Sequence, residues 1–181
     1  MKKLFRYLWL FIKTVLRLVL KPLSFLPAIF MMYFIFSMSA QTGDESGSLS
    51  LKVSTAIVKV ANEVLDENWT PEQVLNKAEE YHHIVRKLAH FTEYFVLAIT
   101  VAFPLYVYGL RGFPLVIIAG LFCVGFAALD EYHQSFVAGR GPSKKDVIID
   151  SCGAFLGIYV TRFFSFIGRK TIFAPLAKDR D

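Results

Sequence analysis

Long apolar runs alternate with short polar stretches along this chain. The runs cover Leu23–Ala40, Leu88–Leu110, Gly112–Leu129 and Val147–Gly168. Each is close to the roughly 20 residues that a helix needs to cross a hydrocarbon core of about 30 Å. Because unpaired backbone groups are costly in lipid, each run is expected to be helical. We therefore predict the all-α fold class: a polytopic membrane protein with a four-transmembrane-helix bundle.

The composition agrees with the membrane class. Of 181 residues, 55% are hydrophobic and only 19% are charged, whereas about 25% of the residues of a soluble domain are charged. The length suits a single domain. The predicted organisation has a membrane domain over residues 22–168, which includes a loop over residues 41–87. A basic helix over residues 1–21 precedes it, and a tail over residues 169–181 follows it.

The first 21 residues predict a basic amphipathic helix of the interfacial kind, lying on anionic headgroups. At 100° per residue, six basic side chains fall within a sector of about 100°. They are Lys2, Lys3, Arg6, Lys13, Arg17 and Lys21. An ordinary charged flank of the first span is the alternative. In both cases the positive-inside rule places both termini in the cytoplasm and the loop 41–87 outside. The first apolar run is longer than the core of a signal peptide, which favours a retained anchor.

The segment between the first two apolar runs predicts a small helical cap packed on the mouth of the bundle. Residues 41–50 have the composition of a turn and loop. Apolar residues then recur at helical spacing over residues 51–66. A second helix start follows, with Thr70 as N-cap, Pro71 at the first helical position and Gln73 completing a capping box.

Ionisable residues gather at the ends of the other runs. Where the second run begins, Arg86, His90 and Glu93 fall within about 60° on a helix, and Tyr94 stands beside them. The third run ends in a further polar group, which comprises Asp130, Glu131, His133 and Gln134.

The fourth run begins with a helix-start signature. Ser143 and Asp146 have the S-x-x-D spacing that favours Ser143 as a cap. Asp150 shares a narrow face with Gly153 and Gly157, whose spacing allows two membrane helices to approach closely. Asp150 is therefore expected to face another helix.

In the predicted topology the three polar groups lie at one level, in the outer leaflet. Charges there cost at least a few kcal/mol unless they are paired or hydrated, so they indicate a functional site. The alternative is structural pairing, for example of Asp150 with Arg86 or Arg140. Arg140 offers a fork of donors for phosphate or carboxylate. We expect one cavity that opens to the outer leaflet, lined by His90, Glu93, Asp130, Glu131, His133, Arg140 and Asp150.

Three stretches carry a family resemblance: FSMSAQTGDESGSLS, RKLAHFTEYFVLA and DEYHQSFVAGRGPSKKDVIIDSCGAFLG. Together they resemble the VanZ-like family of bacterial integral membrane proteins. The resemblance implies a small multi-pass protein of the bacterial cytoplasmic membrane and cell envelope. It also implies a link to resistance against teicoplanin, an antibiotic with a lipid tail that targets wall precursors. It implies no particular reaction.

Two classes of function fit these residues. The first is an enzyme acting on a phosphate-bearing lipid or a lipid-linked wall precursor by acid–base chemistry. Its candidate acid/base residues are His90, Glu93, Asp130, Glu131 and His133. Its candidate substrate-binding residues are Arg86, Tyr94, Gln134, Arg140, Ser143, Asp146 and Asp150. The second class is a protein that binds lipid headgroups, or shields the membrane from lipid-tailed antibiotics, without turnover.

The cofactor and the partners are less constrained. Oxygen and nitrogen ligands suit Mg²⁺, Mn²⁺ or Zn²⁺, so a divalent metal at His90, Glu93, Asp130 and His133 is one hypothesis, although no H-E-x-x-H motif occurs.

The net charge of +5 comes mainly from the two ends, so nucleic acid is not an expected partner. A proton-coupled transporter is a third possibility and would need a dimer. The substrate and the oligomeric state stay open.

Overall fold

A computed structural model describes residues 21–170 of the chain, together with residues 6, 7, 9, 11, 14, 15 and 19. From residue 26 onward this part forms the helices α2 (Leu26–Ser39), α3 (Gly43–Val64), α4 (Pro71–Val107), α5 (Gly112–Gln134) and α6 (Lys144–Lys170). Most of the basic helix predicted over residues 1–21, and nearly all of the tail, lie outside the described residues. The predictions for these two segments therefore stay untested.

Four helices in the described residues are long and apolar enough to cross a membrane. They are Lys21–Ser39, Pro71–Val107, Gly112–Gln134 and Lys144–Gly168. The all-α fold and the four predicted spans are confirmed. Two helices are longer than predicted. The second begins at the Thr70 cap and runs on through the span as one helix, and the third includes the polar residues up to Gln134.

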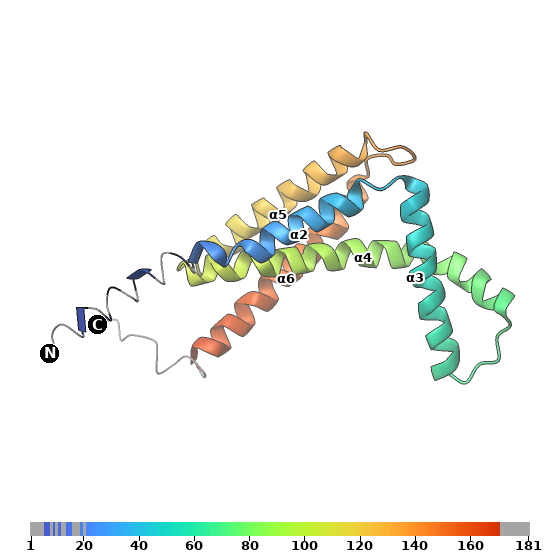
Figure 1. Ribbon diagram of the computed structural model, residues 1–181, viewed down its shortest axis with the longest axis horizontal. Helices are drawn as coiled ribbons and strands as arrows, with labels where there is room; N and C mark the ends of the chain where they lie inside the picture. Colours follow the sequence, from blue (N-terminus) through green and yellow to red (C-terminus); the bar gives the residue numbers. More distant parts are fainter. Residues whose placement is uncertain are drawn as a thin grey trace.

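The helices α2, α4 and α5 run side by side, and α6 crosses them at an angle (Figure 1). The helix α4 is the centre of the bundle, since it packs on α2, α3, α5 and α6. The core between them is apolar and includes Ile35, Leu97, Leu115 and Ile158. The surface away from this core carries many exposed aromatic and aliphatic side chains. This distribution is the one expected where lipid is the solvent.

Two glycines of α6 bring its backbone directly against α4. A β-carbon at Gly153 would overlap with the carbonyl oxygen of Phe91, and one at Gly157 would overlap with that of Phe95. The predicted role of this glycine face as a helix contact is confirmed. The same contact holds Asp150, one turn earlier on α6, in a buried position where only 2% of its surface is exposed.

The helix α3 begins eight residues earlier than the sequence predicted, so the expectation of a loop over residues 41–50 is wrong. The reason is a second capping box. The hydroxyl oxygen of Thr42 accepts from the backbone N–H of Glu45, and the Glu45 carboxylate accepts from the N–H of Thr42 at 2.9 Å. These hydrogen bonds hold the pKa of Glu45 below its ordinary value. The cap offsets the weak helix propensity of the Gly- and Ser-rich turns that follow.

The helix α3 lies across the direction of the bundle (Figure 1). Its first residue, Gly43, donates its N–H to the carbonyl oxygen of Ala138 at 3.0 Å. Its C-terminal half packs Val58 against Val74 and Ala78 at the start of α4. The capping box predicted at Thr70 is confirmed there. We use "α3 end" for the end of the bundle that carries α3 and the 135–143 loop.

Candidate functional site

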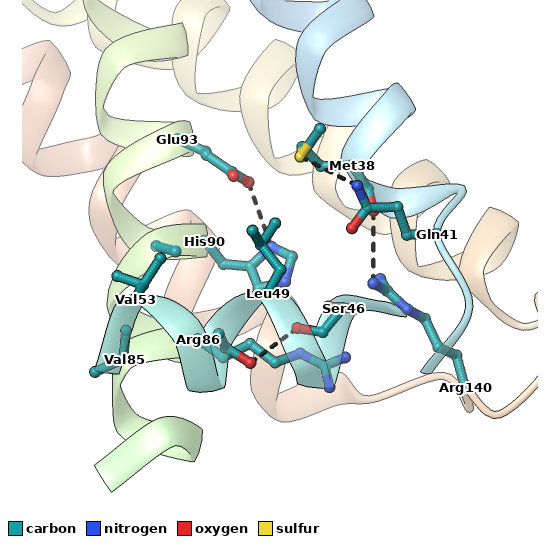
Figure 2. A pocket seen from close by; sticks show the side chains of 12 residues that line it. Met38, Gln41, Ser46, Leu49, Val53, Val85, Arg86, His90, Glu93 and Arg140 are labelled. Atoms are coloured by element: carbon teal, nitrogen blue, oxygen red, sulfur yellow. Dashed lines mark hydrogen bonds and ion pairs between the residues drawn. The ribbon is translucent and has the colours of Figure 1, made fainter. Parts of the chain in front are cut away.

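The α3 end contains a cavity of about 130 Å³ between α2, α3, α4 and the 135–143 loop. A single water molecule requires roughly 10–15 Å³ of such a cavity, so this cavity has room for a group of several heavy atoms. Figure 2 shows side chains from all four segments converging on it. The polar residues of its wall include Gln41, Ser46, Arg86, His90, Glu93 and Arg140.

His90 and Glu93 form a pair on one face of α4, as their spacing predicts. The His90 Nδ1 atom lies 3.5 Å from the Glu93 Oε2 atom, and both side chains are only 18% exposed. Neither of these two atoms makes a hydrogen bond. An imidazole and a carboxylate in this arrangement can exchange a proton with a bound group, which is the requirement of acid–base chemistry.

The Arg140 guanidinium lies across the cavity from this pair. Its Nη2 atom donates to the Met38 carbonyl oxygen at 3.5 Å, which is a long hydrogen bond (Figure 2). Its Nε and Nη1 atoms are buried without a partner. Within the described residues no carboxylate forms an ion pair with Arg140. Burial lowers the pKa of Arg140, and the nearby Arg86 lowers it further. Arginine nevertheless stays cationic at neutral pH.

A second cavity, of about 100 Å³, lies on the other side of Arg86 and His90. Its acidic wall comes from Asp146 and Asp150 of α6. The Oδ1 atom of Asp150 is buried without a hydrogen-bond partner, and no cation of the described residues pairs with it. The structural pairing of Asp150 with Arg86 or Arg140, the alternative that the sequence left open, is therefore not observed.

Asp130 belongs to a buried polar network between α2 and α5. Its Oδ2 atom accepts from the Ser39 hydroxyl at 2.8 Å and from Gln134 Nε2 at 3.2 Å. Gln134 Nε2 also lies 2.9 Å from the Ser39 hydroxyl oxygen. The other carboxylate oxygen of Asp130 has no partner. These bonds hold Asp130 and Gln134 in place and leave one oxygen of Asp130 free.

Glu131 connects the end of α5 to the start of α6. Its Oε2 atom accepts from the backbone N–H of Ser143 at 2.7 Å. The Ser143 hydroxyl oxygen in turn accepts from the N–H of Asp146 at 3.2 Å, which confirms Ser143 as a helix cap. These contacts favour a structural role for Glu131 and Ser143 in positioning the 135–143 loop.

His133 and Tyr94 border the site. The His133 ring lies 4.3 Å from the Phe36 ring, centroid to centroid, and its Nδ1 atom is buried without a partner. Tyr94 is fully buried, and its hydroxyl group also lacks a partner. The ring of Tyr94 lies 6.2 Å from that of Phe126. Both side chains therefore add polar atoms to the interior of the α3 end.

Buried polar atoms without a partner are concentrated in this one region. Such atoms are uncommon in folded proteins, and each costs on the order of 1–3 kcal/mol when left unpaired. Those at the α3 end belong to Ser54, His90, Glu93, Tyr94, Asp130, His133, Arg140 and Asp150. A cluster of this kind is expected where a protein receives a polar ligand.

The expectation of one cavity lined by seven residues needs correction. His90, Glu93 and Arg140 line the first cavity, and Asp150 lines the second. Asp130, Glu131 and His133 line neither of these two cavities. Among the described residues, no three His, Cys, Asp or Glu side chains are placed to hold a metal ion. The four candidate metal ligands are not gathered into such a group.

Several residues of the site were not found from the sequence. They are Met38, Ser39, Gln41, Ser46, Leu49, Ser50 and Val53. All but Val53 lie in the stretch FSMSAQTGDESGSLS, which contributes to the family resemblance. That resemblance was the available signal, but small hydroxyl and apolar side chains carry no chemistry of their own that would mark them.

A protein-family model also matches the chain. The family described as VanZ/LLP1 matches residues 24–165, a stretch that contains every residue of both cavities. No curated protein and no solved structure matches the chain.

Proposed function

From the premise that this chain belongs to the VanZ/LLP1 family of membrane proteins, we propose that it binds a phosphate-bearing lipid or a lipid-linked wall precursor. The site is the cavity between Arg140 and the His90–Glu93 pair. In this proposal the α3 end faces outward, as the basic N-terminal residues predict by the positive-inside rule. The protein would then act in the outer leaflet of the bacterial cytoplasmic membrane.

The observation that carries the proposal is the state of Arg140. A half-buried guanidinium with two unpartnered nitrogen atoms, and with no ion-paired carboxylate among the described residues, is complementary to an anion. Phosphate accepts two parallel N–H bonds from arginine, and such charge-assisted bonds are about twice as strong as neutral ones. Arg86, in the same wall, adds positive charge. The half-buried setting strengthens this attraction, because the local dielectric is lower than that of water.

The His90–Glu93 pair supports acid–base action on the bound group. With the phosphate held by Arg140, the pair would lie opposite it, where a proton can be given to or taken from an ester or phosphate oxygen. Asp130, Glu131 and His133, also candidates from the sequence, do not line the cavity that contains Arg140. The proposal therefore assigns the proton transfer to His90 and Glu93 alone.

A second candidate function is binding or shielding without turnover. It is favoured by the state of Ser50 in the wall of the first cavity, because its hydroxyl donates to backbone carbonyls of its own helix and not into the cavity. In that case the pair would only hydrogen-bond the headgroup. The family's link to teicoplanin resistance would then arise from occupation or masking of a lipid-linked target.

Binding is tested with purified protein in nanodiscs that contain phosphatidylglycerol, with native mass spectrometry of the retained lipid. The change Arg140→Gln should lower the affinity at least tenfold. The matched control is Lys145→Gln, which removes the same charge from an exposed neighbour outside both cavities. Equal retention of lipid by the two variants would contradict the proposal.

Turnover is tested separately. Cell-envelope lipids incubated with the protein are analysed by mass spectrometry for new products, and Glu93→Gln is the key variant. An enzyme should lose product formation in this variant and still bind lipid. A binding protein should form no product in either form, and its effect on teicoplanin susceptibility should follow lipid affinity across the variants.

A further inference from the structure

The helix α3 has an apolar stripe that no other part of the described chain covers. Five side chains make up this stripe, namely Leu49, Val53, Ile57, Val60 and Val64. At 100° per residue they fall within a sector of about 80°. Their exposed fractions run from 44% for Leu49 to 76% for Val64. A water-soluble helix would not leave so regular a row of aliphatic side chains exposed.

The stripe is distinct from the face of α3 that packs on α4. That packing face carries Ser50, Ser54 and Val58, which are buried. By the same helical geometry it lies about 100° away from the centre of the stripe. A third face, on the other side of the stripe, is polar and carries the exposed residues Ser48 and Lys59. The helix therefore has one protein-facing, one apolar and one polar side.

The apolar side is directed toward the body of the bundle. Leu49 and Val53 line the first cavity together with Met38 of α2 and Glu93 of α4, which are residues of membrane-spanning helices. Figure 2 shows these side chains grouped around the cavity. The helix α3 lies across the bundle at the ends of the spans (Figure 1). A bilayer around the spans would therefore have its surface at the level of the stripe.

We infer that α3 lies in the outer surface of the bilayer, with its apolar stripe immersed among the acyl chains. An amphiphile that is embedded in the membrane would then enter the neighbouring cavity laterally, from within the bilayer. The stripe continues the lipid-facing surface of the spans, as in helices that lie in the interface with a polar face above and an apolar face below. Leu49 and Val53 belong both to the stripe and to the cavity wall. The ligand's chains would stay in lipid while its headgroup reached Arg140. This inference rests on the proposed function, which it deepens by naming the class of ligand and its route.

The position of α3 is tested by spin labelling in vesicles of phosphatidylcholine and phosphatidylglycerol. Cys123 and Cys152 are first replaced by alanine, and single cysteines are placed on the stripe (Val60→Cys, Val64→Cys) or on the polar face (Ser48→Cys, Lys59→Cys). Oxygen, which concentrates in lipid, should relax the stripe labels more than a water-soluble nickel chelate does. The polar-face labels should show the reverse order. Equal nickel accessibility on both faces would overturn the inference.

The route is tested by comparing long-chain phosphatidylglycerol with glycerol 3-phosphate as ligands of the same protein. We expect at least a tenfold preference for the long-chain lipid, with both signals weakened by Arg140→Gln. Equal affinities would overturn lateral entry and leave the headgroup site standing. If the protein binds neither ligand, the proposed function is overturned. The inference about the ligand and its route then falls as well, whatever the spin labels report for α3.

Discussion

The hydroxyl group of Ser39 donates a 2.8 Å hydrogen bond to Oδ2 of Asp130, across 91 positions of the sequence. Both side chains are buried, and the bond joins the last turn of α2 to the end of α5. The bond holds the last turn of α2 in place. Met38, the residue before Ser39, belongs to this turn, and its carbonyl oxygen accepts the hydrogen bond from Arg140. The bond therefore links the packing of the bundle to the position of the Arg140 side chain.

Ser39→Ala should lower the stability of the protein by about 1–3 kcal/mol, because it removes a donor from a buried carboxylate. The measurement is thermal unfolding in detergent or nanodiscs. The matched control is Ser37→Ala, since the Ser37 hydroxyl bonds only to Phe34 of its own helix. Equal melting temperatures of the two variants would show that the network does not stabilise the bundle.

Gly153→Ala should destabilise the contact between α4 and α6 by about 1–3 kcal/mol, because the added methyl group meets backbone that cannot move aside. The control is Gly125→Ala in α5, where nothing lies within 4 Å of the added carbon. Alanine there should be neutral or slightly stabilising, as expected from its better helix propensity. Unfolding curves of both proteins decide the matter, and a loss of the same size in the two would refute the contact.

Glu131 and Glu93 should respond differently to substitution. Glu131→Ala leaves the buried N–H of Ser143 without its acceptor and should cost about 1–3 kcal/mol of stability. Glu93→Gln removes a half-buried charge whose Oε2 atom has no hydrogen bond, so the fold should be as stable or more stable. Paired measurements of unfolding and of lipid turnover separate the two roles. A strongly destabilised Glu93→Gln protein would indicate that this carboxylate is structural.

The orientation predicted from the basic ends can be tested in intact cells, in a protein without its two natural cysteines. Ser48→Cys, at an exposed position of α3, should react with a membrane-impermeant thiol reagent. Lys178→Cys, in the basic tail, should react only after the cells are opened. The opposite pattern would mean that the α3 end faces the cytoplasm and would exclude an outer-leaflet ligand.

The sequence by itself determined the class of the protein and most of its helices. The backbone of a long, largely apolar run can be satisfied in lipid only as a helix, so Gly112–Leu129 and Val147–Gly168 indicated spans without any tertiary information. The capping box at Thr70 and the cap at Ser143 are local chemistry, and both are confirmed. The early start of α3 was also local, but the Gly- and Ser-rich composition of residues 41–50 obscured the box formed by Thr42 and Glu45.

Only the tertiary structure decided how the polar residues are divided. Helical periodicity shows which side chains share a face of one helix, and it grouped His90 with Glu93 in this way. It does not show which face of a neighbouring helix these side chains contact. The close approach of Gly153 to the Phe91 carbonyl sets that register and places Asp150 at a second cavity. Ser39 and the 135–143 loop engage Asp130 and Glu131 in hydrogen bonds. Arg140 is half-buried and has no ion-paired carboxylate among the described residues. Such pairing depends on distances between helices that the order of residues does not contain.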